Sequence, residues 1–78
     1  MSTHSEPLND VTEHIGNALR SRRKKVGMSL RDVAEMSGVS LGHICLVENG
    51  RRRISADRLY ELAVVLRTTV GHLFRGLN

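Results

Sequence analysis

Two clusters of basic side chains carry the most distinctive chemistry in this sequence. Arg51, Arg52 and Arg53 follow Gly50 without interruption, and the fork of each guanidinium group matches the geometry of a phosphate. Residues 20–25, with the sequence Arg-Ser-Arg-Arg-Lys-Lys, form the other cluster. We expect both clusters to contact phosphates. The alternatives are a solvated loop for the arginines and a solvated helix end for residues 20–25, where cations also suit the helix dipole.

The composition favours a polyanionic partner and a single small domain. The 78 residues carry a net charge of +4 and have a pI of about 10.2, which suits DNA, RNA or an anionic membrane surface. A merely basic surface would give the same values. Aromatic residues make up 3% of the chain, which argues against a protein that stacks single-stranded bases on aromatic side chains. A core of this size is small, so self-association would add stability.

The groups that enzymes and metal sites need are not arranged for that chemistry. The candidate ligands are His4, His14, His43, His72 and Cys45, and they show no metal-ligand spacing. The sequence contains neither a phosphate-cradling glycine loop nor a nucleophile–base motif. We therefore expect no enzyme, no metal and no cofactor, and no small-molecule ligand is evident. Cys45 could serve as a thiol switch, or it could be an inert small residue.

Cysteine usage and hydropathy indicate a protein of the cytoplasm. A lone cysteine excludes an intrachain disulfide and suits a reducing compartment. No apolar run is long enough for a signal peptide or a membrane span. We therefore predict a cytoplasmic localisation without membrane association.

The stretch from Ser29 to Asn49 predicts two short helices around a tight turn. Ser29 and Ser40 can cap these helices by accepting hydrogen bonds from free backbone N–H groups. Gly38 supplies the positive φ that is needed where the first helix ends. The residues expected to face the core are Val33, Ala34, Met36, Val39, Ile44 and Val47, with the small Ala34 where the two helices cross. The pattern is that of a helix-turn-helix.

A longer helix is predicted before this stretch. Asp10 and Glu13 have the spacing of a capping box at its start. Its apolar stripe comprises Val11, Ile15, Ala18, Leu19 and Val26, and Gly16 is expected only to weaken the helix slightly. Residues 1–9 are polar and lack periodicity, so we interpret them as a flexible N-terminal arm. The structured domain is then residues 10–78.

Two more helices are predicted after the helix-turn-helix. Ser55 can cap the first of them and Thr69 the second. The core-facing residues of the first helix are Leu59, Leu62, Ala63 and Leu66. The second, short helix holds Val70, Leu73 and Phe74. Tyr60, Val64 and Val65 widen the apolar surface of the first helix. The chain is therefore predicted to be an all-α bundle of five helices.

These elements make the chain resemble the lambda-repressor-like, or XRE, family of small DNA-binding domains. The resemblance runs over residues 15–74 and rests on the blocks Leu19–Arg23, Gly27–Ser29, Asp32–Ala34, Gly38–Ser40, Ile44, Val47–Gly50 and Val70–Phe74. It implies the lambda-repressor-like five-helix fold and an inward ion pair between Arg23 and Glu48. It also implies that the last helices form a two-fold dimer contact. The dimer-interface residues would be Val70, Leu73, Phe74 and Leu77.

The resemblance further implies that residues 41–48 form the recognition helix, which lies in the major groove of B-DNA. The DNA-binding residues would be Ser29, Arg31, Ser40, Leu41, Gly42, His43, Leu46, Asn49, Arg51, Arg52 and Arg53. Within the helix region only Ser40 and His43 offer hydrogen bonds to bases, although His43 could also be an ordinary exposed histidine. Leu41 and Leu46 could contact thymine methyl groups or pack against neighbouring helices.

The function expected from these observations is sequence-specific regulation of transcription. A homodimer would bind a near-palindromic operator in double-stranded DNA and would repress by occupying a promoter. Controller proteins of restriction–modification systems share this minimal architecture, and they activate as well as repress. The alternative is an antitoxin or another protein-interaction module with a helix-turn-helix fold. A third possibility is that the chain is the DNA-binding part of a longer protein.

Overall fold

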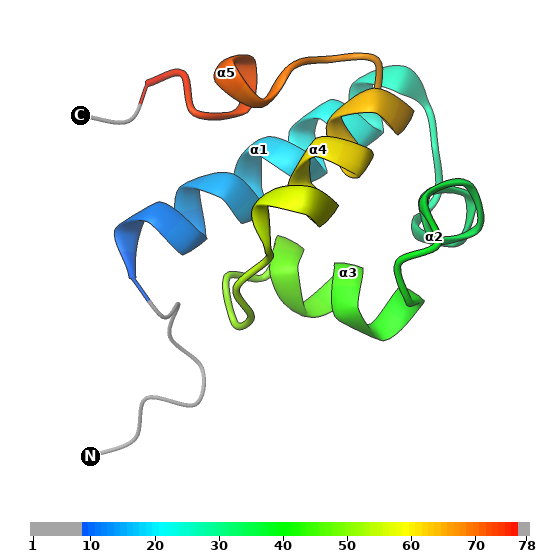
Figure 1. The fold of residues 1–78 in the computed structure, drawn as a ribbon, viewed down its shortest axis with the longest axis horizontal. Helices are drawn as coiled ribbons and strands as arrows, with labels where there is room; N and C mark the ends of the chain where they lie inside the picture. The colour runs from blue at the N-terminus through cyan, green and yellow to red at the C-terminus, as the bar shows by residue number, and fades with distance from the viewer. Residues whose placement is uncertain (1–8, 77–78) are drawn as a thin grey trace.

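A computed structural model describes residues 9–76 of the chain. Within this range the chain forms helices and no strand. The helices are α1 (Asp10–Val26), α2 (Leu30–Ser37), α3 (Leu41–Glu48), α4 (Ala56–Val65) and α5 (Val70–Leu73) (Figure 1). The predicted all-α fold of five helices is confirmed. Of the predicted N-terminal arm only Asn9 is described, and the predicted dimer residue Leu77 lies outside the described residues.

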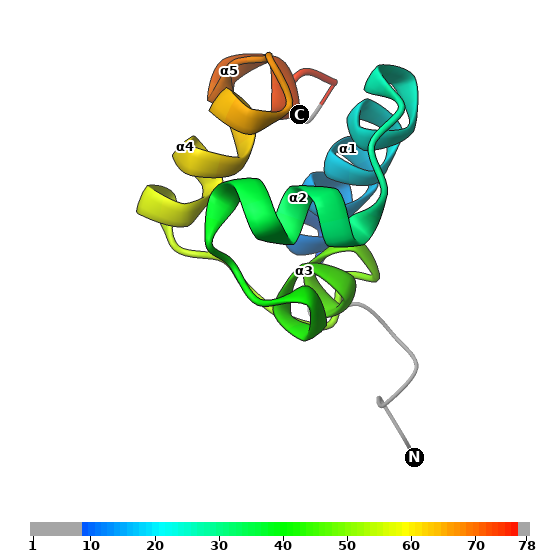
Figure 2. The same ribbon diagram turned by 90° about the vertical axis from the view of Figure 1, so that its right-hand side faces the viewer.

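The helices surround one aliphatic core. α1 packs against α3 and α5, α2 packs against α3 and α4, and α4 packs against α5. Figure 2 shows α1 and α4 on two sides, with α3 at the opposite end of the molecule from α5. The buried core residues are Ile15, Leu19, Val33, Val39, Ile44, Val47, Leu59, Leu62, Ala63, Leu66 and Leu73. This arrangement leaves one side of α3 at the edge of the molecule, where it can meet a partner.

Every helix begins with a polar side chain that accepts a hydrogen bond from a backbone N–H group. These caps are Asn9, Ser29, Ser40, Ser55 and Thr69. Four of the five agree with the sequence prediction, but the predicted capping box of Asp10 and Glu13 is wrong. Asn9 takes the cap position because its Oδ1 accepts from the N–H of Thr12 at 2.8 Å, which places Asp10 inside the helix.

The cap of α2 is reciprocal. The Ser29 hydroxyl oxygen accepts from the N–H of Asp32, and the N–H of Ser29 donates to the Asp32 carboxylate, both at 3.0 Å. The backbone N–H of Ser29, followed by its side chain, holds the pKa of Asp32 below its ordinary value. At the other end of α2, Gly38 adopts the left-handed conformation with φ 78°, as the turn requires.

Three apolar residues lie elsewhere than the sequence predicted. Leu73, predicted at a dimer interface, is 1% exposed because it fills the core between α5 and the helices beneath it. Met36 is 66% exposed, since α2 packs through Leu30, Val33 and Ala34 at helical spacing. Val11 is 46% exposed because it lies in the first turn of α1.

The end of α1 is joined to the end of α3 by a buried ion pair. Arg23 donates from Nε to Oε2 of Glu48 at 2.7 Å and from Nη2 to Oε1 at 3.0 Å. The Glu48 carboxylate is buried, and Nε of Arg20 lies 3.5 Å from Oε1. The hydrogen bond from Glu48 raises the pKa of Arg23 above its ordinary value. The pair that the family resemblance implied is therefore present in the structure.

Gly16 marks a second close contact between the same two helices. A Cβ atom at this position would lie 2.8 Å from the carbonyl oxygen of Glu48 and still closer to that of Val47. Real Cβ atoms do not approach backbone oxygens to these distances, so only glycine lets α1 and α3 pack this closely. The expectation that Gly16 only weakens α1 slightly was incomplete. The packing of α1 against α3 requires a residue without a Cβ atom at this position.

We predict that Gly16→Ala destabilises the protein. Alanine is favoured over glycine inside a helix by about 1 kcal/mol, but here its methyl group must push two backbone carbonyls of α3 away, and such overpacking costs typically about 1–3 kcal/mol. Gly42→Ala is the matched control, because a Cβ at Gly42 meets nothing within 4 Å. Thermal unfolding should show a lower Tm for Gly16→Ala and an unchanged or higher Tm for Gly42→Ala. Equal melting temperatures for both variants would contradict the close contact.

We also predict that Glu48→Ala unfolds the domain more easily. Removal of the carboxylate leaves the Arg23 guanidinium partly buried without its counter-ion, and such a loss costs about 3–5 kcal/mol. Glu35→Ala, which removes an exposed carboxylate of α2, should change the free energy of unfolding by less than about 0.5 kcal/mol. Urea denaturation of both variants measures the difference. A Glu48→Ala protein as stable as wild type would show that the pair contributes no net stability.

Candidate nucleic-acid interface

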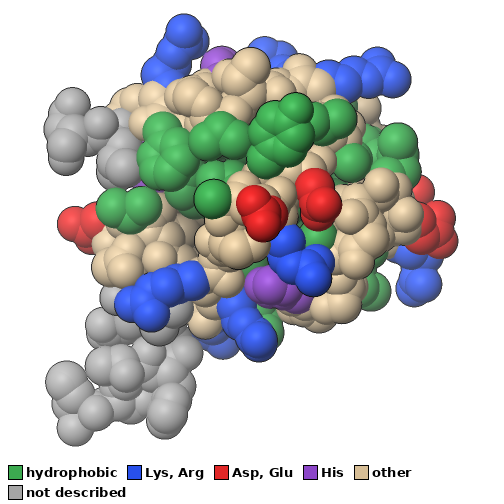
Figure 3. All heavy atoms as spheres, viewed as in Figure 1, with side chains coloured by type: hydrophobic (Ala, Val, Ile, Leu, Met, Phe, Trp, Pro, Cys, Tyr) green, Lys and Arg blue, Asp and Glu red, His purple; other side chains and the backbone are tan. Residues whose placement is uncertain are grey.

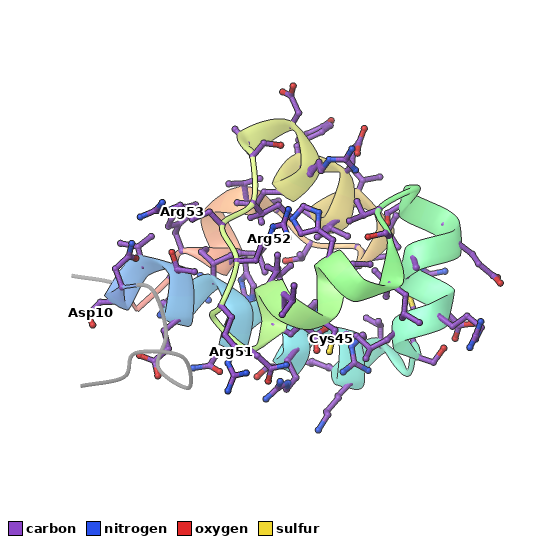
Figure 4. All side chains as sticks on the ribbon, turned by 90° about the horizontal axis from the view of Figure 1, so that it is seen from below. Asp10, Cys45, Arg51, Arg52 and Arg53 are labelled. Carbon is purple, nitrogen blue, oxygen red and sulfur yellow. The ribbon has the colours of Figure 1, made fainter. Side chains whose placement is uncertain are left out.

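α3 turns one face inward and the other towards solvent. Ile44, Val47 and Glu48 are buried, whereas Leu41 and Leu46 are exposed on the other side. Gly42 and Cys45 are exposed on that side as well. The loop that follows α3 carries Arg51, Arg52 and Arg53, as Figure 4 shows from below. Of the residues of this helix that were predicted to contact DNA, Leu41, Gly42 and Leu46 are exposed, whereas His43 is half-buried.

His43 connects the start of α3 to this loop. Its backbone N–H donates to the Ser40 hydroxyl at 3.1 Å, and its ring Nε2 lies 3.4 Å from the carbonyl oxygen of Arg53. The residue as a whole is half-buried. Because a carbonyl only accepts hydrogen bonds, this contact favours a proton on Nε2.

Backbone hydrogen bonds fix the loop that carries Arg51, Arg52 and Arg53, whereas their side chains form no ion pair with the described residues. Gly50 has φ 74° and donates its N–H to the carbonyl of Val47 at 3.0 Å. The N–H of Arg51 donates to the carbonyl of Leu46 at 2.9 Å, so the loop is fixed to the end of α3. All three guanidinium groups are exposed. Both ion pairs that the structure forms within residues 9–76 involve Glu48 and none of these arginines.

The basic cluster at residues 20–25 is divided between two roles. Arg20 and Arg23 bond Glu48, and Arg22 donates to the carbonyls of Leu66 and Arg67 at 2.8 and 2.7 Å. The remaining cations, Lys24 and Lys25, are exposed. The three arginines thus hold the fold together, whereas Lys24 and Lys25 form no ion pair with any residue of the described range 9–76.

The role of Arg22 was missed by sequence reasoning. Its two hydrogen bonds clamp the turn between α4 and α5, where Arg67 has the left-handed φ of 59° that a non-glycine residue rarely adopts. No local pattern in the sequence marks this contact, because its partners are backbone carbonyls more than forty residues away. The clamp fixes where α5 lies on the rest of the domain.

Asn49 is also bonded within the protein. Its Oδ1 accepts from Nη2 of Arg20 at 2.7 Å, and its Nδ2 donates to the carbonyl of Cys45 at 2.8 Å. The amide nitrogen of Asn49 thus caps the C-terminal end of α3, and its amide oxygen joins α3 to α1. This bonding does not support the predicted role of Asn49 as a DNA contact. Ser29 and Arg31 are exposed at the start of α2, with the Ser29 hydroxyl engaged in the cap.

A band of hydrophobic side chains crosses α4 and α5 on a different face of the molecule (Figure 3). Its most exposed members are Tyr60 at 64% and Val64 at 57%. Phe74, directly after α5, is exposed as well, and Val70 is half-buried against the core. We call these four residues the α4–α5 band. It contains two of the four predicted dimer residues, together with two that the sequence had marked only as extra apolar surface.

Within residues 9–76, no group of three histidine, cysteine, aspartate or glutamate side chains is placed to hold a metal ion. In the same range no helix combines the length and apolarity needed to cross a membrane.

Comparison with known proteins identifies the family. A model of the helix-turn-helix family HTH_3 matches residues 19–73. An uncharacterised transcriptional regulator encoded in the ATPase CF(0) region of Rhodospirillum rubrum is 36% identical over 71 residues, which are 91% of this chain and 66% of that protein. The transcriptional regulator ClgR of Mycobacterium tuberculosis is 35% identical over 73% of this chain and 51% of its own length. The chain thus spans about half to two thirds of the length of these two relatives.

Solved structures agree with this assignment. The clp gene regulator ClgR of Corynebacterium glutamicum superposes with a TM-score of 0.82 at 35% identity, over 87% of this chain and 72% of that one. The restriction–modification controller protein C.AhdI of Aeromonas hydrophila superposes with a TM-score of 0.78 at 30% identity, over 81% of this chain and 96% of that one. The chain therefore belongs to the HTH_3, or XRE, family of helix-turn-helix domains.

Proposed function

We propose that this domain binds double-stranded DNA sequence-specifically and regulates transcription. The observation that carries the proposal is the exposed face of α3 beside a loop whose three arginines are free of ion pairs in the described part of the chain. An α-helix fits the major groove of B-DNA and offers its N-terminal side chains to the bases. Similar proteins named as transcriptional regulators support this function.

The chemistry divides between positioning and readout. Arg51, Arg52 and Arg53 would bind phosphates and hold α3 in register without reading sequence. Base recognition would fall to the first turns of α3, where Leu41 and Leu46 present methyl groups that can contact thymine. Because this face has few hydrogen-bonding groups, specificity would depend strongly on DNA shape and deformability.

The assembly we propose is a homodimer formed through the α4–α5 band. Tyr60 and Val64 expose large apolar surfaces on one face of α4, and a second copy of the chain would cover them. A two-fold axis would place two α3 helices about 34 Å apart, facing successive major grooves. The operator would then be a near-palindrome, and a bound dimer would repress by excluding polymerase from the promoter.

Selection of bound sequences from random duplex DNA tests the function directly. The full chain should enrich one near-palindromic motif with half-sites about one helical turn apart. Enrichment of a single half-site would retain DNA binding but contradict the dimer. Absence of any enriched sequence would contradict sequence-specific binding.

Replacement of Arg52 tests the phosphate contacts. Arg52→Ala should weaken binding to operator and random DNA about equally and should reduce the slope of log K against log salt by about one unit, because one phosphate contact is lost. Arg75→Ala is the control, since it removes the same charge after α5, at the end of the molecule away from α3. Equal slopes for wild type and Arg52→Ala would exclude this contact.

Replacement of Val64 tests the dimer. Val64→Asp should produce a monomer in sedimentation equilibrium, because a charge in an apolar interface would lose its hydration without a partner. Its affinity for a palindromic operator should fall at least tenfold, since two linked sites bind more tightly than one. Met36→Asp changes an equally exposed apolar residue outside the band and should leave the mass unchanged. A dimeric Val64→Asp protein would refute this interface.

A further inference from the structure

A groove of about 540 Å³ opens between the first turn of α1 and the loop that joins α3 to α4. Its apolar wall consists of Val11, Ile15, Val47, Ile54, Leu59 and Phe74. Val11 and Phe74 remain exposed on this wall, so the domain does not fill the groove with its own described side chains. The volume lies within the range of small-molecule pockets, about 300–1,000 Å³. The proposed DNA contacts explain only Arg52 and Arg53 of this lining, and the α4–α5 band only Phe74, so the concave apolar wall as a whole has no role in either.

The charges at its rim define what could bind there. Arg52 and Arg53 line the groove and are exposed, whereas Arg51, in the same loop, does not line it. One carboxylate, that of Asp10, also lines the rim. Figure 4 labels these side chains on the loop and at the start of α1. The first turn of α1 adds the partial positive charge of a 17-residue helix. Positive charge therefore exceeds negative charge where the apolar wall meets solvent.

We propose that the groove binds an amphipathic organic anion, with its hydrocarbon part on the apolar wall and its carboxylate at Arg52 and Arg53. Burial of a hydrocarbon chain against the apolar wall is favourable because it removes apolar surface from water. The two guanidinium groups can bind a carboxylate through charge-assisted hydrogen bonds. Since the same guanidinium groups would bind DNA phosphates, ligand and DNA would compete. Only that competition rests on the proposed function, because the groove itself exists without DNA.

Titration of the full, ¹⁵N-labelled chain with decanoate, without DNA, tests the site. Saturable shifts are expected in the backbone amides of residues around the groove, such as Val11, Ile54 and Phe74. Decanol should bind about tenfold more weakly, because it lacks the charge that the arginines bind, and acetate should not saturate. Equal binding of decanoate and decanol, or saturable shifts confined to other surfaces, would overturn the proposal.

Matched variants separate the groove from general charge attraction. Arg53→Ala should weaken decanoate binding about tenfold, whereas Arg51→Ala, with the same change in net charge, should leave it unchanged. Val11→Trp should block the groove, whereas Met36→Trp, which adds the same ring to exposed α2 surface, should not. Equal effects of Arg51→Ala and Arg53→Ala would mean nonspecific attraction and refute the site.

The link to DNA is measured separately. Decanoate should raise the apparent Kd for DNA of wild type, and this effect should be lost in Val11→Trp, which keeps all three loop arginines. If the chain binds decanoate but no DNA, the proposed function fails and the ligand site stands. If it binds DNA but not decanoate, the ligand site fails and the proposed function stands.

Discussion

The buried carboxylate of Glu48 is the interaction on which the position of α3 depends. A buried charge is costly unless it is paired, and here Arg23 supplies a two-point contact from the end of α1. The backbone carbonyls of Val47 and Glu48 in α3 lie against Gly16, which is also in α1. The C-terminal end of α3 is thus fixed to α1 by both its side chain and its backbone. The N-terminal turns of α3 are then free to present their outer face without losing orientation.

Arginine does two different jobs in this domain, and the sequence alone does not separate them. Arg20, Arg22 and Arg23 stand in a basic run, yet each finds acceptors inside the fold, on Glu48, on Asn49 or on backbone carbonyls. The arginines of residues 51–53 are equally basic but form no ion pair within residues 9–76, because their loop lies at the edge of the molecule. Whether an arginine can bind an external anion therefore depends on which acceptors the fold places next to it, and not on the neighbouring residues in the sequence.

Most helices could be predicted because their signals are local. Capping serines, the left-handed Gly38 and helical apolar spacing each act within a few residues. The close contact at Gly16 and the hydrogen bond from Arg20 to the Asn49 side chain could not be predicted, because each depends on a helix far away in the sequence. Leu73 was misjudged for a related reason: an apolar residue in a terminal helix fits a core or a dimer equally well, and only the packing of α5 decides.

The α4–α5 band and the groove differ in shape and charge, and this difference is why we propose different partners for them. The α4–α5 band presents large side chains outward from helices, which suits a second copy of the chain. The groove is concave and bordered by Arg52 and Arg53, which suits a small anion. Phe74 belongs to both surfaces. In the proposed dimer, a ligand that changes the packing of Phe74 would therefore change self-association, and dimer formation would change ligand affinity by the same factor.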